Sequence, residues 1–210
     1  MTDDSNTRAR IDTDLNLHAF FREALGLALT ERNVATSAPT EHYLVALLVD
    51  FVQPDELAHE ALERPIPFLL SEAMNTVGRE RFDRLRALGD AVLFTSGFFK
   101  DHYETRGLRL QYVSSLGARA YDGAASMLRT TDRSNGPRAP ELFEELADKF
   151  TAFVHVLGNV ADGFFARSAQ SGDSGTLRVY ERWLHTGSRQ LAAALANRGL
   201  MPSRGPGGVH

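Results

Sequence analysis

The chain has 210 residues, of which 43% are hydrophobic and 24% are charged, and its net charge at pH 7 is -4. This balance is typical of a globular protein of about one domain and excludes a largely disordered chain. The mild negative charge argues against a protein built around nucleic acid binding, and the absence of cysteine excludes thiol catalysis, disulfides and cysteine-ligated metals.

The sequence predicts a soluble cytoplasmic protein that does not enter a membrane. Residues 1–14 are polar and contain no apolar core of a signal peptide. The longest apolar run, Tyr43–Val49, is far shorter than the roughly 20 residues that cross a bilayer. Arginine greatly outnumbers lysine and alanine is abundant, which we interpret as a sign of bacterial origin from a GC-rich genome.

In the first part of the chain, apolar residues recur every three or four positions, which predicts helices. A first helix is expected over 16–32, followed by a break at 36–40 that contains capping residues. The next helix, 41–53, is apolar on nearly all sides, so we expect it to be buried. Prolines bound a short helix over 54–64, and a further short helix or turn is expected over 68–75.

A long helix is predicted over 79–99. Its first half is charged, and Arg79–Asp83 and Glu80–Arg84 have the four-residue spacing of ion pairs on a solvated face. Its second half loses its polar side and must enter the core. After an exit loop, a helix over 110–129 is expected, and its surface is nearly bare of large side chains.

The C-terminal part contains the most regular apolar repeat of the chain, from Glu141 to Phe164. A last helix is predicted over 176–197, with Leu177, Tyr180, Leu184 and Leu191 on one face. We therefore predict an all-α fold, a compact bundle of seven to eight helices with no β-sheet. Residues 15–198 form one domain in this prediction, between a flexible N-terminus (1–14) and a flexible Gly/Pro-rich tail (199–210).

The stretch Ala87–Phe99 contains a single charge, Asp90, and two helix-interior glycines, Gly89 and Gly97. Each glycine costs about 1 kcal/mol relative to alanine, so a compensating contact is expected. Close packing against the helix 110–129 would compensate, and so would a ligand lying against the glycine backbone. We predict the packing, with the ligand as the open alternative.

Asp90 needs a partner, because a carboxylate buried alone would cost several kcal/mol. Arg86, Arg109 and Arg119 are the candidates, and a structural ion pair is the predicted role, with a general base or a ligand-binding acid as the alternative. The candidate ligand-binding residues are Asp90, Ser96, Gly97, Phe98, Tyr112 and Tyr121.

Two segments carry a family resemblance. Arg86–Phe99, with the pattern RxLGDxxLFxSGFF, and Tyr112–Tyr121, with the pattern YxxxLGxxAY, resemble an uncharacterised family of bacterial helical proteins with no assigned activity. The resemblance implies only that these two helices face one another and form the signature of the family.

Two enzyme-like alternatives remain weaker. His18 on the first helix and Leu88-Gly89-Asp90 before Ser96-Gly97 resemble heme-oxygenase-like proteins, but the Ser-Gly step comes too late in the sequence. Glu56 and His59 have the E-x-x-H spacing of di-iron proteins, which need a second such motif that this chain lacks.

We therefore predict no catalytic residue, no metal site and no cofactor. The predicted function is that of a non-enzymatic adaptor, a regulatory protein or a small-ligand-binding protein. Its expected partners are another protein or a small apolar ligand, with a homodimer as a further possibility; nucleic acid and membrane are not expected. The amphipathic helices, and Trp183 on the last of them, are candidates for a partner surface.

Overall fold

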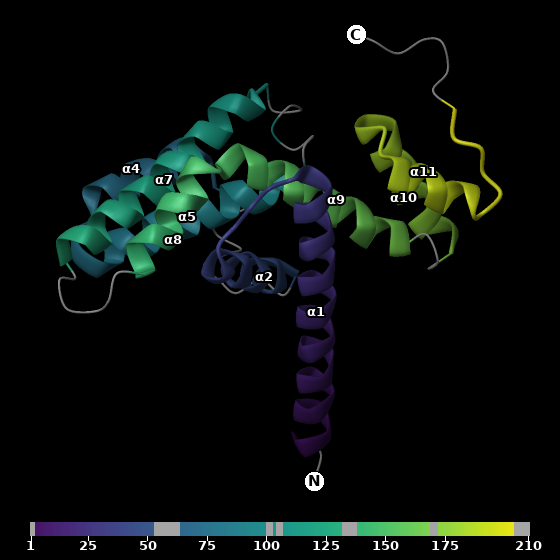
Figure 1. Cartoon of the computed structure of the whole chain (residues 1–210), viewed down its shortest axis with the longest axis horizontal. Coiled ribbons are helices and arrows are strands. Elements are labelled where there is room, and N and C mark those ends of the chain that lie inside the picture. Colours follow the sequence, from purple (N-terminus) through teal and green to yellow (C-terminus); the bar gives the residue numbers. More distant parts are fainter. Residues whose placement is uncertain are drawn as a thin grey trace. The chain divides into compact units, whose positions relative to one another are not determined.

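The structure is a computed structural model that describes residues 3–52, 64–99, 103, 107–131, 138–168 and 172–203. Over these residues the chain forms nine helices and no strand, so the predicted all-α class is confirmed, with slightly more helices than expected (Figure 1). None of the described helices combines the length and apolar character needed to cross a membrane.

The helix bounds agree with the predicted ones over much of the chain. The helices are α1 (Asp3–Arg32), α2 (Ala38–Val52), α4 (Ile66–Asn75), α5 (Gly78–Phe98), α7 (Leu110–Thr131), α8 (Arg138–Asp148), α9 (Phe150–Ser168), α10 (Asp173–Thr186) and α11 (Arg189–Ala196). The first helix begins at Asp3 rather than near residue 16, in a segment without the apolar period on which the prediction relied. The predicted helix over 54–64 falls almost entirely on residues 53–63, outside the described part.

The regular repeat that begins at Glu141 forms two helices, α8 and α9, which meet at Lys149. The backbone ladder continues through this point, because the Lys149 N–H donates to the Glu145 carbonyl at 3.0 Å and the Phe153 N–H donates to the Lys149 carbonyl at 2.9 Å. The interruption is therefore small, and the side chains keep the predicted three-and-four spacing across it.

The predicted last helix is divided into α10 and α11, and the prediction of one helix over 176–197 is wrong. Gly187 adopts a left-handed conformation with φ of 64°, and its N–H donates to the Trp183 carbonyl at 2.8 Å. This is the usual glycine termination of a helix, since glycine has no Cβ to strain that conformation.

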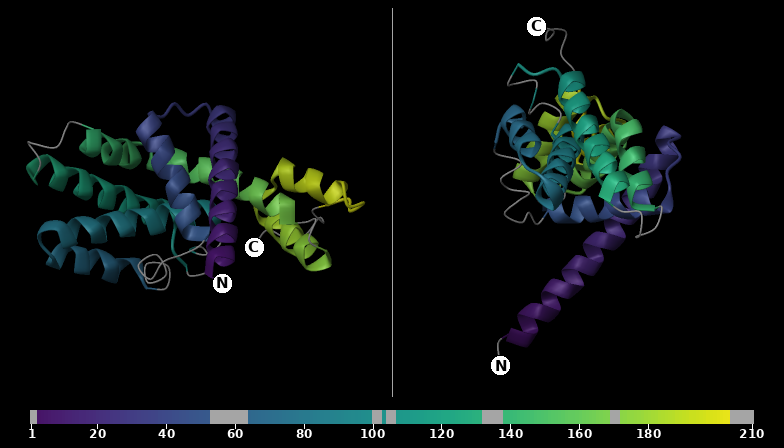
Figure 2. Two further views of the ribbon diagram at one scale, coloured as in Figure 1. Left: turned by 90° about the horizontal axis from the view of Figure 1, so that it is seen from below. Right: turned by 90° about the vertical axis from the view of Figure 1, so that its left-hand side faces the viewer.

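The chain divides into two compact units, which we call unit 1 (residues 1–157) and unit 2 (residues 158–210). The single domain predicted for 15–198 spans both and stays a prediction. Within unit 1, α5 packs most extensively against α7, α7 packs on α8, and α4 packs on α5 (Figures 1 and 2). The core of unit 1 includes these fully buried side chains: Phe21, Leu25, Leu44, Leu48, Leu88, Leu93, Tyr121, Phe150 and Phe153.

Unit 2 has a small core of its own, made by the buried side chains Val179, Trp183, Leu191 and Leu195. The predicted apolar face of the last helix is therefore wrong in part: Leu177 and Leu184 are exposed, while Val179 and Trp183 are buried. Trp183 is thus a core residue rather than part of a partner surface.

A charged pair lies beside the core of unit 2. The Arg182 Nε donates to Asp162 Oδ1 at 2.7 Å, and both side chains are largely buried. The Arg182 guanidinium also lies over the Phe165 ring, 4.8 Å from its centroid. These contacts connect α9 to α10 through a paired charge, as burial of a charge requires.

Candidate functional site

The candidate site is centred on Asp90 of α5. One carboxylate oxygen, Oδ1, accepts hydrogen bonds from two tyrosine hydroxyls: Tyr43 of α2 at 2.6 Å and Tyr121 of α7 at 2.7 Å. Tyr121 is fully buried, whereas Tyr43 and Asp90 are partly buried. We call these three residues the Tyr–Asp–Tyr cluster. It connects three helices of unit 1 through a single oxygen atom.

The pKa of Asp90 is raised from 3.8 to about 6, chiefly because burial disfavours the charged carboxylate. The hydrogen bonds from Tyr43 and Tyr121 and the positive charge of Arg86 lower this pKa, and the negative charge of Asp50 raises it. Burial dominates, so the carboxyl group changes its charge in the mildly acidic range rather than near pH 4.

Burial also raises the pKa of both tyrosine hydroxyls, and the nearby Asp90 charge raises them further. They therefore keep their protons and act as hydrogen-bond donors. Burial lowers the pKa of Arg86, but the attraction of Asp90 and Tyr43 outweighs it and the net shift is upward. The site thus contains one titrating carboxyl group, two permanent donors and one permanent cation.

The Asp90 partners agree only in part with the predicted ones. Arg86, one turn back on α5, supplies the positive charge that acts on Asp90, while Arg109 and Arg119 lie exposed on the surface. The direct hydrogen-bond donors are tyrosines, and neither was proposed as a partner of Asp90. Tyr43 was not among the predicted site residues, because it begins the longest apolar run and the sequence there indicates only a buried helix.

Close packing around Gly89 fixes the position of Tyr121. A Cβ atom at Gly89 would lie 2.6 Å from Cδ1 and Cε1 of the Tyr121 ring, so only glycine leaves room for that ring. From the opposite side, a Cβ atom added at Gly117 of α7 would lie 2.3 Å from Cζ of Phe150 and 2.8 Å from Cγ1 of Val92 on α5. The small surface of α7 therefore receives α5, as the sequence predicts.

Gly97 has a different neighbour from the predicted one. A Cβ atom there would lie 2.5 Å from the Leu157 Cβ and 3.3 Å from the Val154 carbonyl oxygen, both on α9. The closest approach at Gly97 is therefore to α9 rather than to α7. The sequence alone does not indicate which of the two helices, α7 or α9, lies nearer to Gly97.

The remaining predicted site residues lie apart from the Tyr–Asp–Tyr cluster. Ser96 is fully buried, and its hydroxyl has no hydrogen-bond partner among the described residues. Phe98 stacks on Phe94 with ring centroids 4.7 Å apart. Tyr112 is 53% exposed on α7. Of the predicted set, Asp90 and Tyr121 are joined directly, by a hydrogen bond of 2.7 Å.

A second polar cluster anchors α2, the helix that carries Tyr43. Glu145 of α8 accepts hydrogen bonds from the Ser37 N–H at 3.1 Å and the Thr40 hydroxyl at 2.7 Å, and Lys149 Nζ contacts it at 2.8 Å. Burial raises the pKa of Glu145, but these hydrogen bonds outweigh it and lower the pKa to about 2. Glu145 thus caps the N-terminus of α2 from another helix, which local capping rules do not reveal.

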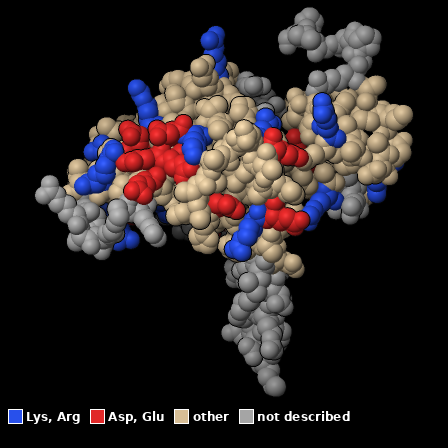
Figure 3. All heavy atoms as spheres, viewed as in Figure 1, with Lys and Arg blue, Asp and Glu red and all other residues tan. Residues whose placement is uncertain are grey.

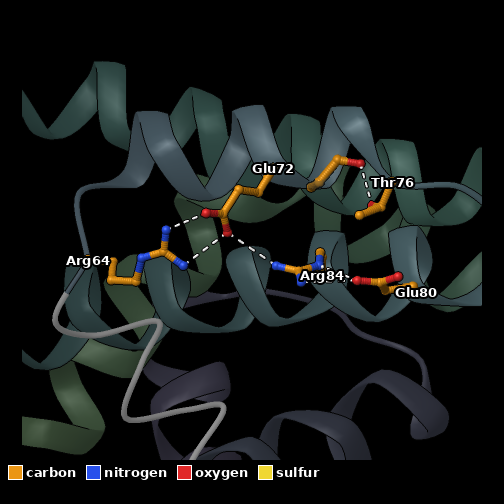
Figure 4. A network of polar contacts seen from close by, with 6 residues as sticks. Arg64, Glu72, Thr76, Glu80 and Arg84 are labelled. Carbon is orange, nitrogen blue, oxygen red and sulfur yellow. Dashed lines mark hydrogen bonds and ion pairs between the residues drawn. The ribbon is translucent and has the colours of Figure 1, made fainter.

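Charged residues elsewhere on unit 1 are joined in ion pairs. The predicted pairs Arg79–Asp83 (3.8 Å) and Glu80–Arg84 (3.0 Å) are confirmed. Arg84 also contacts Glu72 of α4 at 3.2 Å, and Glu72 pairs in turn with Arg64 (Figure 4). Such exposed pairs contribute at most about 1 kcal/mol each.

Acidic side chains also gather on one face of unit 1, over α5, α7 and α8, with basic side chains around them (Figure 3). On α8, Glu144 pairs with Arg129 at 2.5 Å and Glu145 pairs with Lys149 at 2.8 Å. These contacts have a structural explanation and do not by themselves indicate a ligand.

The two enzyme-like alternatives gain no support from the described residues. Among them, no group of three or more His, Asp or Glu side chains is placed to hold a metal ion. The E-x-x-H pair Glu56 and His59 lies outside the described residues, and His18 is a half-buried side chain on α1. Comparison of the chain with protein-family models, curated proteins and solved structures found no match.

Proposed function

We propose that this chain is a non-enzymatic adaptor or regulatory protein, and that the Tyr–Asp–Tyr cluster is a structural junction rather than a catalytic or ligand-binding site. The observation that supports this proposal is the use of Asp90 Oδ1, which already accepts two tyrosine hydroxyls at 2.6 and 2.7 Å. These two internal donors give the buried carboxylate a structural role between α2, α5 and α7.

The packing of α5 supports the same proposal. Gly89 and Gly97 lie against Tyr121 and Leu157 so closely that even a methyl group would collide. The glycine backbone is therefore occupied by protein at both positions, in the place where the alternative would put a small ligand. The resemblance of the α5 and α7 segments to an uncharacterised bacterial family remains part of the proposal.

The experiment compares Asp90→Asn with the wild-type protein purified from rich medium. We expect Asp90→Asn to lower the free energy of unfolding, and we expect neither protein to show a Soret band or stoichiometric iron. A Soret band or stoichiometric iron in the wild-type protein would instead favour the heme-oxygenase-like or di-iron alternative. An Asp90→Asn variant of wild-type stability that loses a bound ligand or partner would contradict the structural role.

A further inference from the structure

Helix α10 presents an apolar surface that the core of unit 2 does not use. Leu177 and Leu184 are 57% and 41% exposed. They are two helical turns apart and therefore lie on the same side of the helix. The buried side chains of α10, Val179 and Trp183, lie on another side and form the core with α11.

The exposed leucines are continuous with that core. Tyr180, half-buried between them, contacts the Trp183 ring with centroids 6.0 Å apart. A helix whose exposed side carries two large apolar residues beside a half-buried tyrosine is typical of a surface that another helix covers.

The charges beside the leucines indicate what covers them. Arg178 and Glu181 are exposed, and neither forms an ion pair within the described part of the chain. The pair Leu177/Leu184 is centred between residues 180 and 181, and the pair Arg178/Glu181 is centred between 179 and 180. Both pairs therefore have nearly the same midpoint along the helix.

We propose that α10 is a homodimer interface, in which the α10 of a second copy of this chain packs antiparallel against it. A twofold axis near Tyr180 places Leu177 opposite Leu184 of the second copy, and Arg178 beside Glu181 of the second copy. Each contact then occurs twice, as a symmetric interface requires. In a parallel arrangement, by contrast, twofold symmetry would place the Arg178 and Glu181 flanks of the two copies on opposite edges of the interface, so Arg178 would not lie beside Glu181 of the second copy.

The interface is small, since a helix of 14 residues is only about 21 Å long. Interfaces of this size belong to weak complexes, so we expect a dimer whose population depends strongly on protein concentration. This proposal does not depend on the role of Asp90, which lies in the other unit.

The test measures the molar mass of the full chain by sedimentation velocity and light scattering from about 10 µM to 1 mM, a range suited to a weak interface. We expect the wild-type mass to rise toward that of a dimer and the Leu177→Glu/Leu184→Glu variant to remain monomeric. Met201→Glu is the matched control, because Met201 is 90% exposed in the same unit but lies outside α10, and it should dimerise like the wild type.

Charge reversal provides an independent test at exposed positions, where folding is not at risk. Arg178→Glu and Glu181→Arg alone should each weaken the dimer, and the two together should restore it. A wild-type protein that is monomeric at 1 mM, or a leucine variant that dimerises normally, would overturn the proposal. So would single charge reversals that leave the dimer unchanged.

Discussion

The raised pKa of Asp90 predicts an unusual dependence of stability on pH. In the unfolded chain this carboxyl group titrates near 3.8, and in the folded protein near 6. Between these values the folded state binds the proton more tightly than the unfolded state does. The contribution of Asp90 to stability is therefore greatest below pH 4, falls as the pH rises to 6, and is constant above that.

The magnitude follows from the two pKa values. A rise from 3.8 to about 6 corresponds to ~3 kcal/mol, which is an upper value because Asp90 is only partly buried. Since other carboxyl groups also titrate in this range, the wild type must be compared with Asp90→Asn, in which position 90 does not titrate.

The assay is urea unfolding of both proteins at several values of pH between 4 and 7.5. We expect the wild-type free energy of unfolding, taken relative to that of Asp90→Asn, to fall by 2 to ~3 kcal/mol between pH 4 and pH 6.5. A difference that stays constant across this range, or that increases with pH, would refute the assigned burial of the carboxylate.

Three further predictions concern other contacts. Gly97→Ala should destabilise the protein by about 1–3 kcal/mol, because the added Cβ would collide with Leu157. The control variant Gly26→Ala, which has open space around the added Cβ, should be neutral or stabilising. Thermal unfolding of both variants distinguishes these outcomes. Glu145→Gln should lower the free energy of unfolding by about 1–3 kcal/mol at pH 7. The difference from the wild type should shrink as the pH falls from 4.5 toward 2, because the wild-type carboxylate then becomes protonated. Urea unfolding of both proteins across this pH range measures the difference. Asp162→Ala should lower the free energy of unfolding by about 3 kcal/mol, because it removes a 2.7 Å ion pair between two largely buried side chains. An equally stable variant would argue against a stabilising role for this pair.

The sequence predicts the helices well where the apolar period is strong. The bounds of α5 and α7 follow from repeated spacing, and the small residues of α7 correctly indicate a helix that receives another closely. Gly187 is itself a local signal for the end of a helix, and it divides the predicted last helix into α10 and α11. The prediction missed this division because the apolar pattern continues past Gly187.

The arrangement of the site is only partly contained in the sequence. Asp90 stands out as a lone charge in an apolar run, but its donor Tyr43 is remote in sequence and lies on α2. Likewise, Glu145 caps a helix that begins more than a hundred residues earlier. Such contacts depend on which helices become neighbours, and periodicity within one helix carries no information about that.

The central claim, that Asp90 is a desolvated junction between two tyrosine donors, is tested most directly by NMR titration of its side-chain carboxyl carbon. We predict a midpoint near pH 6 in the wild type. In Tyr121→Phe we predict a still higher midpoint, because a hydrogen bond that stabilises the charged carboxylate is lost. A wild-type midpoint near 3.8, or one that Tyr121→Phe leaves unchanged, would contradict the claim.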